Sequence, residues 1–371
     1  HNKHARPTAW WNPSRLFQAV FHSLKKSVPK KIQGKSAYPG FGFSASVWKS
    51  SSQAVFRVIG DPESLLTCPP VTPSPLMLNR LSSARLDYFN LHGLVDGADW
   101  YGQRDVTDNS GGPDYPVALS PKDIPQASSG TRIVFTEACY GAHIEDRSEE
   151  YSIALKFMAN GCLAFVGSTC VSYGSVTTPL IAADLLAYYF WKSIKEGKTV
   201  GEAFVQSKVS LVDEMGRRQG YLDGEDQKSL ISFVLYGDPL VTAEEGAVKA
   251  KAFTRLQQHP VVKVICDSEN EEEGEMVPEA MLTRVKGLVN QYLPGLQGAD
   301  FTIRSQQPLF DEDGRPTKSL QMGKAYRGKQ PAKHTVIRLS KQVEFARHIH
   351  HHYARITLDG KGKLVKMSLS R

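Results

Sequence analysis

Between residues 85 and 240 the apolar positions follow a repeating order of short continuous runs and longer helical patterns. Continuous apolar runs are typical of strands buried on both faces, and a recurrence every three to four residues is typical of helices. The strands predicted in this way are 87–92, 132–139, 162–170 and 232–239, and the helices are 148–160, 179–196 and 199–214. This series predicts an α/β fold, in which a mostly parallel sheet carries helices on both faces.

The first 84 residues carry a weaker pattern. Residues 1–45 are basic and rich in Pro, Gly and Ser, which indicates an arm or connector with one short helix over 13–28. The stretch 44–60 is strand-like, most clearly at 55–59, and 76–84 predicts a short helix. Because only one strand is evident here, we expect the chain to be the C-terminal portion of a longer precursor, whose N-terminal fragment completes the sheet.

After residue 240 the pattern changes again. The α/β domain is expected to cover 46–255, and the acidic run within 256–277 predicts a solvated linker. A small α+β domain over 278–371 follows, with a helix and then strands that end in a hairpin. Its predicted helix is 278–293, and its strands are 299–305, 335–339, 347–358 and 363–370.

Four histidines lie in the strand predicted over 347–358. His348, His350 and His352 alternate onto one face and His351 faces the other. Imidazoles in this arrangement can bind a metal ion. No acidic or Cys ligand lies close to them in the sequence, so the favoured interpretation is that they are exposed on an edge strand and that no metal is held.

Composition narrows the class of protein. The chain of 371 residues is 41% hydrophobic and 22% charged, as in ordinary globular proteins. Its longest apolar window, 179–191, is too short to span a bilayer and contains Asp184. Five cysteines without a CxxC spacing predict neither a disulfide framework nor a zinc site. No charged-then-apolar leader follows the first residue, so the compartment stays open between cytoplasmic and exported, and no membrane partner is expected.

Charge is distributed unevenly along the chain. Residues 1–60 carry ten Lys or Arg and no acid, and residues 300–371 carry fifteen bases against six acids, so the region between them is acidic. Basic ends can bind nucleic acid or another anionic surface. Ends that fold back onto the acidic body, or are solvated, are the simpler interpretation. A nucleic acid partner is therefore not expected.

Candidate chemistry lies where two predicted strands end. One strand ends at His92 and Gly93, and another ends at Cys139. The carboxyl ends of neighbouring parallel strands meet at one crevice, so an imidazole and a thiol that are 47 positions apart can come together as a nucleophile and its proton partner. The amides of Gly93 and Cys139 are placed to bind an oxyanion, and Gly141 permits a tight turn. The alternative is a structural Cys that is buried in its strand.

These residues resemble a known family. The His92-Gly93 and Glu137-Ala-Cys-Tyr-Gly141 blocks, at close to the roughly 50-residue spacing of caspases, resemble the caspase-like cysteine peptidases. The blocks 167–173 and 235–239 resemble the gingipain-like peptidase family C25, so that the likeness covers about residues 85–242. It implies a caspase-like fold, His92 as general acid and base, and Cys139 as the nucleophile that cleaves a protein or peptide substrate.

The resemblance also implies a specificity pocket. One of its walls would be the strand 162–169 with the loop that follows, including the substrate-binding candidates Ser168, Thr169, Cys170 and Tyr173.

Glu137 lies two positions before Cys139 and therefore faces the same side of the strand. The legumain, clostripain and metacaspase branches carry an acid at this position, so we expect Glu137 to recognise Arg or Lys before the scissile bond. The gingipain pattern has no acid there, and Thr177 stands where its lysine-specific members carry Asp. Because legumain cleaves after Asn, a neutral residue stays an alternative.

Two other classes of function stay open. The chain could be a catalytically silent member of the family that serves as a binding or assembly module, or a Cys-His hydrolase that acts on a non-peptide acyl group. No cofactor is required by the predicted chemistry. Oxygen ligands for Ca²⁺ are offered by the acidic loop, although the spacing fits no standard site. Its acids are Asp96, Asp99, Asp105, Asp108 and Asp114.

Overall fold

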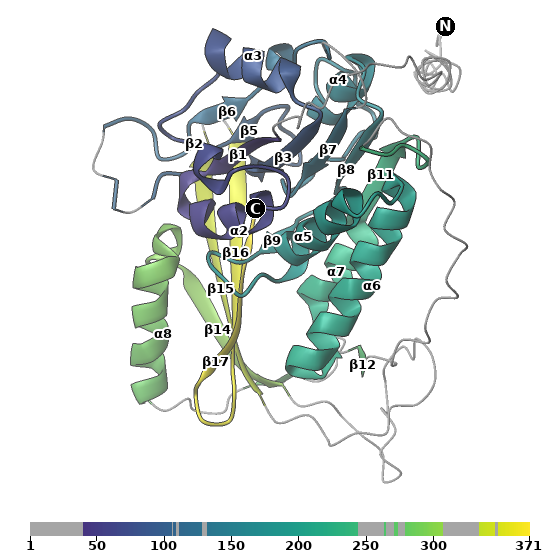
Figure 1. Ribbon diagram of the computed structural model, residues 1–371. Coiled ribbons are helices and arrows are strands. Elements are labelled where there is room, and N and C mark those ends of the chain that lie inside the picture. Colours follow the sequence, from purple (N-terminus) through teal and green to yellow (C-terminus); the bar gives the residue numbers. More distant parts are fainter. Residues whose placement is uncertain are drawn as a thin grey trace, which may run out of the picture.

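The computed structural model describes nine segments of the chain (Figure 1). These are residues 40–105, 107–108, 111–127, 132–243, 263–264, 271–273, 279–306, 334–345 and 348–371. The helix predicted over 13–28 lies outside them.

The first of two large sheets contains the predicted strands that end near His92 and Cys139. Its order is β2-β1-β3-β7-β8-β11, with β11 antiparallel to β8 and the other neighbours parallel. The strands are β1 (Phe41–Ala45), β2 (Leu66–Cys68), β3 (Leu86–Asn90), β7 (Ile133–Thr136), β8 (Ala164–Ser168) and β11 (Phe233–Gly237). The expectation of a mostly parallel α/β sheet is therefore confirmed. Every residue of β3, β7 and β8 is buried, as their apolar runs predict.

Helices cover both faces of this sheet (Figure 1). Tyr88 of β3 and Phe135 of β7 belong to one core cluster, while Phe89 and Val134, the next residues along, belong to the other. This alternation follows from the two-residue period of a strand. The first cluster includes side chains of α2 (Lys49–Phe56), α5 (Ala182–Lys195) and α6 (Val200–Gln219), and the second includes side chains of α3 (Pro75–Ser83) and α4 (Ile153–Ala159).

Local signals set the ends of the helices. Thr199 and Glu202 form the predicted capping box at the start of α6, which ends at Gly220 in the left-handed conformation. Ser152 caps α4, and its hydroxyl accepts a hydrogen bond from the amide of Leu155. This cap explains why α4 begins later than the predicted start at residue 148.

A second, antiparallel sheet follows the order β13-β14-β15-β16-β17-β9. Its strands are β13 (Glu271–Glu273), β14 (Asp300–Gln306), β15 (His334–Phe345), β16 (His348–Leu358), β17 (Leu364–Ser370) and β9 (Tyr173–Gly174). Side chains of the helix α8 (Glu279–Tyr292) pack into its core cluster. The last strand of this sheet, β9, comes from the loop after β8, so the two sheets are joined.

Buried ion pairs also connect the second sheet to α7 (Gly224–Ser232). The ammonium of Lys366 on β17 lies 2.7 Å from Asp223 and 2.8 Å from Asp226, and Arg355 of β16 lies 3.0 Å from Glu225. These side chains are almost fully removed from solvent, so each charge depends on its partner. They fix the position of β16 and β17 against the first part of the molecule.

Smaller elements complete the description. The loop over 94–126 is not wholly irregular, since a three-stranded sheet forms from β4 (His92–Gly93), β5 (Trp100–Tyr101) and β6 (Val117–Leu119). Two short strands also pair in parallel, β10 (Tyr221–Leu222) and β12 (Lys263–Val264). Short 3₁₀ helices cover Ser46–Trp48, Pro62–Ser64, Pro121–Asp123 and Pro294–Leu296.

Two expectations about the first 84 residues are wrong. The stretch predicted as a strand at 55–59 belongs to α2 and the turn after it, and two strands, β1 and β2, flank this helix. Val55 and Phe56 are apolar and buried in both interpretations, which is why a short apolar run misled the assignment. The strand β1 begins at Phe41, inside the stretch assigned to a basic arm, so the sheet extends before the predicted boundary at residue 46.

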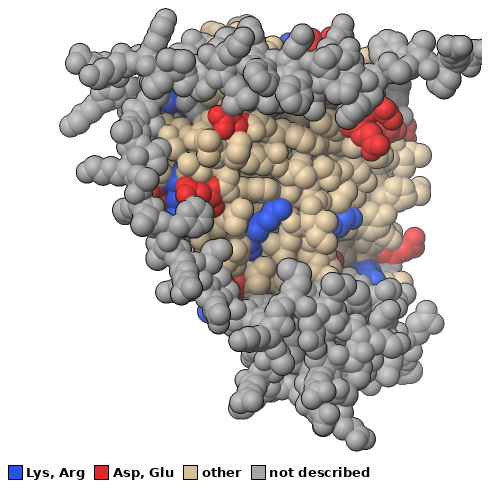
Figure 2. Space-filling view, turned by 90° about the vertical axis from the view of Figure 1, so that its right-hand side faces the viewer, with Lys and Arg blue, Asp and Glu red and all other residues tan. Residues whose placement is uncertain are grey.

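The surface beside α6 carries few charged side chains in Figure 2, which shows the right-hand side of the molecule in Figure 1. Within the described residues, none of the helices is long and apolar enough to cross a membrane.

Candidate active site

His92 lies two residues beyond the end of β3, where it begins β4, and is fully buried. Its Nε2 lies 2.8 Å from the side-chain oxygen of Gln103, a contact that orients the ring. The ring also packs against Trp48 at a centroid distance of 4.4 Å and stacks on His352 at 5.0 Å. The imidazole is thus held by residues from three separate parts of the chain.

Cys139 lies three residues beyond the end of β7 and is also fully buried. Its Sγ lies 3.2 Å from the amide nitrogen of Ser172, which donates a hydrogen bond to it. In the turn after Cys139 the left-handed conformation is adopted by Tyr140, whose φ is 55°. Gly141 is needed for space, because a Cβ there would lie 3.0 Å from the carbonyl oxygen of Ala138.

The structure brings the two reactive groups to the same end of the first sheet. The strands β3 and β7 are parallel neighbours, with Phe89 opposite Thr136 at their carboxyl ends. Gly93 lies so close to Cys139 that a Cβ at Gly93 would overlap its carbonyl oxygen. Only glycine permits this approach. The main chain of Arg371 makes hydrogen bonds to both His92 and Cys139, so a third segment joins the two groups.

Burial makes both groups neutral. It lowers the pKa of His92 to about 3, with a further contribution from His350, and the hydrogen bond to Gln103 opposes this shift. Burial likewise raises the pKa of Cys139 to about 12, against the opposing effect of the main-chain hydrogen bonds of Ser172 and Arg371. At this end of the first sheet the thiol and the imidazole are therefore both in their neutral forms.

Beside Cys139 a buried pocket holds the guanidinium group of Arg371. One terminal nitrogen lies 2.6 Å from a carboxylate oxygen of Asp184 and 2.9 Å from the carbonyl oxygen of Ser175. The Nε lies 3.7 Å from a carboxylate oxygen of Glu137. The indole of Trp48 covers the guanidinium plane at 4.3 Å, a favourable cation-π contact.

Gly174 forms part of the entrance to this pocket. A Cβ there would overlap both the guanidinium of Arg371 and the carboxylate of Asp184. Gly174 belongs to β9, whose Tyr173 pairs with Ser370 in the antiparallel ladder with β17. The position must therefore be glycine for a long basic side chain to enter.

The two carboxylates of the pocket share their charge unequally. Burial and the nearby Asp184 raise the pKa of Glu137 well above its usual range, and Arg371 opposes this shift. The hydroxyl of Tyr88 donates a hydrogen bond of 2.7 Å to Glu137. The raised pKa of Glu137 favours its neutral form, and the guanidinium of Arg371 lies closer to Asp184, at 2.6 Å, than to Glu137, at 3.7 Å.

Of the predicted pocket wall, only Tyr173 lies on the strand that faces β17. The hydroxyl of Ser168 donates to the carbonyl oxygen of Cys170, and Thr169 bonds to Ser232. These contacts direct the two hydroxyls toward the framework of the first sheet. The wall around the Arg371 side chain is instead formed by Gly174, Ser175 and Trp48.

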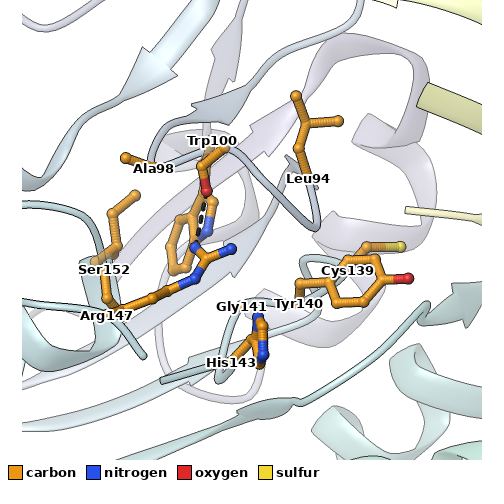
Figure 3. Close-up of a pocket in the computed structure, with 11 residues that line it drawn as sticks. Leu94, Ala98, Trp100, Cys139, Tyr140, Gly141, His143, Arg147 and Ser152 are labelled. Carbon is orange, nitrogen blue, oxygen red and sulfur yellow. Dashed lines mark hydrogen bonds between the residues drawn. The ribbon is translucent and has the colours of Figure 1, made fainter. Parts of the chain in front are cut away.

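On another side of Cys139 a small hollow is lined by residues of the loop over 94–100 and of the turn after β7. Figure 3 shows that the sulfur of Cys139 points away from the part of the hollow that Arg147 fills. The guanidinium of Arg147 donates to the carbonyl oxygen of Gly97 at 2.9 Å and to that of Val95. Arg147 therefore holds this loop in place beside the thiol.

The histidines of β16 are not on an exposed edge strand. This strand lies between β15 and β17, and His350 and His352 are buried. Their ring nitrogens and one of His92 all lie within 4.8 Å of one another, and in the described part of the chain no other group of three potential metal ligands lies as close. Three imidazoles are donors that Zn²⁺ accepts. The prediction of an exposed edge strand was wrong because the packing of β16 against His92 is a long-range contact, and the sequence near the histidines gives no sign of it.

The acidic loop forms contacts of other kinds. Asp108 lies 3.1 Å from Arg104, and the side chain of Asp105 accepts hydrogen bonds from Thr107. Asp96 lies 3.3 Å from the ring of His348. Each of these carboxylates interacts with a neighbouring side chain or main-chain group.

Sequence reasoning missed Asp184, Trp48 and Arg371 in the pocket. Asp184 carried a signal, since it is the acid within an otherwise apolar helix, and such an acid must have a partner when it is buried. Trp48 and Arg371 carried none, because they lie far from the reactive residues in the sequence.

Comparison with protein families matches residues 92–244 to peptidase family C25. The matched segment begins at His92 and includes Cys139, β9 and Asp184, so the resemblance to this family is confirmed. No curated protein matched the chain.

Proposed function

From the premise that residues 92–244 match peptidase family C25, which implies cysteine peptidase activity, we propose that the chain is a cysteine endopeptidase with His92 and Cys139 as its dyad. We further propose that it cleaves after Arg or Lys. One observation supports this specificity. The guanidinium of Arg371 lies between Asp184, Glu137 and Trp48. The main chain of the same residue makes hydrogen bonds to both His92 and Cys139.

The proposed reaction begins when the sulfur of Cys139 attacks the scissile carbonyl carbon and its proton passes to His92. The amides of Gly93 and Cys139 stabilise the oxyanion. His92 then gives the proton to the leaving amine as the peptide bond breaks, which leaves an acyl group on the sulfur. Water, activated by His92, hydrolyses this thioester and restores the thiol. In the cleft that Arg371 occupies, the depressed pKa of His92 keeps its imidazole neutral.

The pocket fits a basic side chain for two reasons. Asp184 supplies a carboxylate at hydrogen-bonding distance, and a charge-assisted contact of this kind is stronger than a neutral one. Trp48 offers a flat face to a planar guanidinium, so Arg should be preferred over Lys. A neutral Asn would leave the charge of Asp184 buried without a partner, which is costly.

Substrate main chain is expected to pair with β9. The loop after β8 already forms an antiparallel ladder there with β17, and Ser172 accepts a hydrogen bond from the amide of Arg371 at 3.0 Å. A site that pairs with main chain favours a peptide over a non-peptide acyl substrate. A silent binding module would not need a thiol and an imidazole beside this ladder.

A peptide-library digest tests the proposal. With Arg371 replaced by Ala, which empties the pocket, the full-length protein should cleave after Arg and, less readily, after Lys, and the additional change Cys139→Ala should abolish these products. Asp184→Asn should reduce cleavage after Arg more than it reduces any residual cleavage after neutral residues. Cleavage that persists in Cys139→Ala would contradict the nucleophile, and products without a basic residue before the cut would contradict the pocket.

A further inference from the structure

We propose that the segment Leu369 to Arg371, the last two residues of β17 and the residue after them, is a tethered substrate-like ligand that occupies the cleft and keeps the peptidase latent. This inference rests on the proposed function, because it assigns a regulatory role to the segment that fills the same site. The segment must move before another peptide can reach Cys139.

The main chain of this segment follows the path expected of a substrate. Leu369 pairs with Gly174 and Ser370 pairs with Tyr173, and Arg371 donates its amide hydrogen to the carbonyl of Ser172. The main chain of Arg371 then reaches His92 and Cys139 by hydrogen bonds. A basic residue thus sits with its backbone at the reactive sulfur, where a substrate residue before the scissile bond would be placed.

The side chain of Arg371 fills the pocket completely. Arg371, Glu137 and Asp184 each have 0% of their surface exposed, and Trp48 also has 0%. A second basic side chain therefore has no room beside it. The side chain of Arg371 and that of an Arg-containing ligand therefore cannot occupy the pocket at the same time.

Contacts made by the earlier residues of β17 keep the segment close to the cleft, and therefore at a high local concentration there. Lys366 forms buried ion pairs with Asp223 and Asp226, and Arg355 to Leu358 of β16 pair with Leu364 to Ser368 of β17. Only the last three residues pair with β9 or enter the pocket. Leu369 and Ser370 also contact Ala354 and Tyr353 of β16, so opening the cleft breaks these contacts as well. The pairing of Leu364 to Ser368 keeps the strand attached, and this short tether returns the segment at an effective concentration in the millimolar range.

Occupation also explains why the thiol is inaccessible. Both Cys139 and His92 are fully buried while Arg371 lies over them, and burial raises the pKa of the thiol. Departure of the segment would return water to the cleft, and the thiol would then ionise more readily. Latency therefore combines a blocked pocket with an unreactive sulfur.

Arg371→Ala in the full chain tests this inference by the rate at which Cys139 reacts with an acyloxymethyl ketone that bears Arg. We expect labelling at least about tenfold faster than in the wild type, because the tether no longer competes. Arg371→Gln is a second variant that keeps most of the side-chain volume, and it should label faster in the same direction. Lys363→Ala removes a charge from an exposed position just before β17 and should label at the wild-type rate.

A binding measurement separates this inference from the proposed function. Agmatine carries a guanidinium and needs no catalysis, so it should raise the melting temperature of Arg371→Ala and Arg371→Gln but not that of the wild type. If agmatine binds the variants but not the wild type and no protein is labelled, the occupation of the pocket by Arg371 stands and the peptidase function fails. If wild type and both variants are labelled equally fast, or agmatine stabilises the wild type equally, the pocket is not blocked and the inference is overturned.

Discussion

The two sheets contribute to the site in different ways. The first sheet delivers His92 and Cys139 from the ends of adjacent parallel strands, so its contribution follows from the order of strands along the chain. The second sheet delivers Arg371, His350 and His352 from strands that are distant in sequence. The reactive groups therefore depend on local pattern, whereas their accessibility depends on long-range packing.

The largest effect on catalysis is expected when a reactive residue of the first sheet is replaced. Cys139→Ala should lower kcat/KM for an Arg-containing peptide by at least about 10⁴-fold, because the loss of a nucleophile leaves only binding and oxyanion stabilisation. His92→Ala should cause a loss of similar size. Steady-state kinetics in the Arg371→Ala background measure both.

Cys162→Ala is a matched control for this prediction, since Cys162 is another fully buried free thiol of the first sheet that lies outside the cleft. It should leave kcat/KM within about threefold of the parent, as expected when a group outside the reacting centre is changed. An equal loss in Cys162→Ala and Cys139→Ala would point to damage of the fold.

The second prediction separates the two acids of the pocket. Asp184→Asn should lower kcat/KM for Arg substrates by about 10²- to 10³-fold, because loss of one partner of a buried ion pair costs about 3–5 kcal/mol. Glu137→Gln should cost no more than about tenfold, because its raised pKa already makes the carboxyl neutral and glutamine has the same shape. A larger effect of Glu137→Gln than of Asp184→Asn would reverse this assignment of the charge.

Much of the first sheet could be predicted from the sequence, and the reason is physical. Buried parallel strands require continuous apolar runs, and their order forces the residues after β3 and β7 to one edge. Strand alternation predicts that Glu137 faces the same side as Cys139, and the resemblance to other caspase-like branches predicts a basic side chain beside it. In the structure Glu137 lies 3.7 Å from Arg371.

The rest of the site could not be predicted because it depends on contacts between distant residues. Trp48 and Arg371 are more than 300 positions apart, yet the indole covers the guanidinium. Similarly, the sequence around His350 predicts an exposed residue, whereas in the structure its ring packs against His92. The hydrophobic periodicity and the charge of the strands in the second sheet do not specify which surface of the first sheet they pack against.

The third prediction concerns the buried imidazoles. Zn²⁺ should inhibit the Arg371→Ala protein, because His92, His350 and His352 offer three nitrogens within 4.8 Å, and metal at His92 prevents proton transfer. Replacing both His350 and His352 with Asn should raise the half-inhibitory zinc concentration by at least about tenfold. Inhibition that is unchanged in this double variant would place the metal elsewhere.

The last prediction concerns stability at mildly acidic pH and involves no catalysis. Burial lowers the pKa of His92 to about 3 and that of His350 to about 4, so both bind a proton more readily when the chain is unfolded. The stabilisation that comes from burying these two neutral imidazoles should be complete above pH 6.5. The free energy of unfolding should then fall as the pH drops toward 4, by up to about 1.4 kcal/mol per pH unit for each histidine. Urea denaturation at several pH values measures this slope, and His350→Asn should reduce it. A slope that is flat over this range would contradict the burial of neutral imidazoles.

Labelling of Cys139 in the Arg371→Ala protein, located by mass spectrometry, tests the central claim most directly. The dyad and the acidic pocket predict a covalent adduct on Cys139 with the ketone that bears Arg, a rate at least about 100-fold lower with the matched ketone that bears Glu, and no adduct in His92→Ala. An adduct that forms at the same rate with both reagents, or that forms on another cysteine, would contradict it.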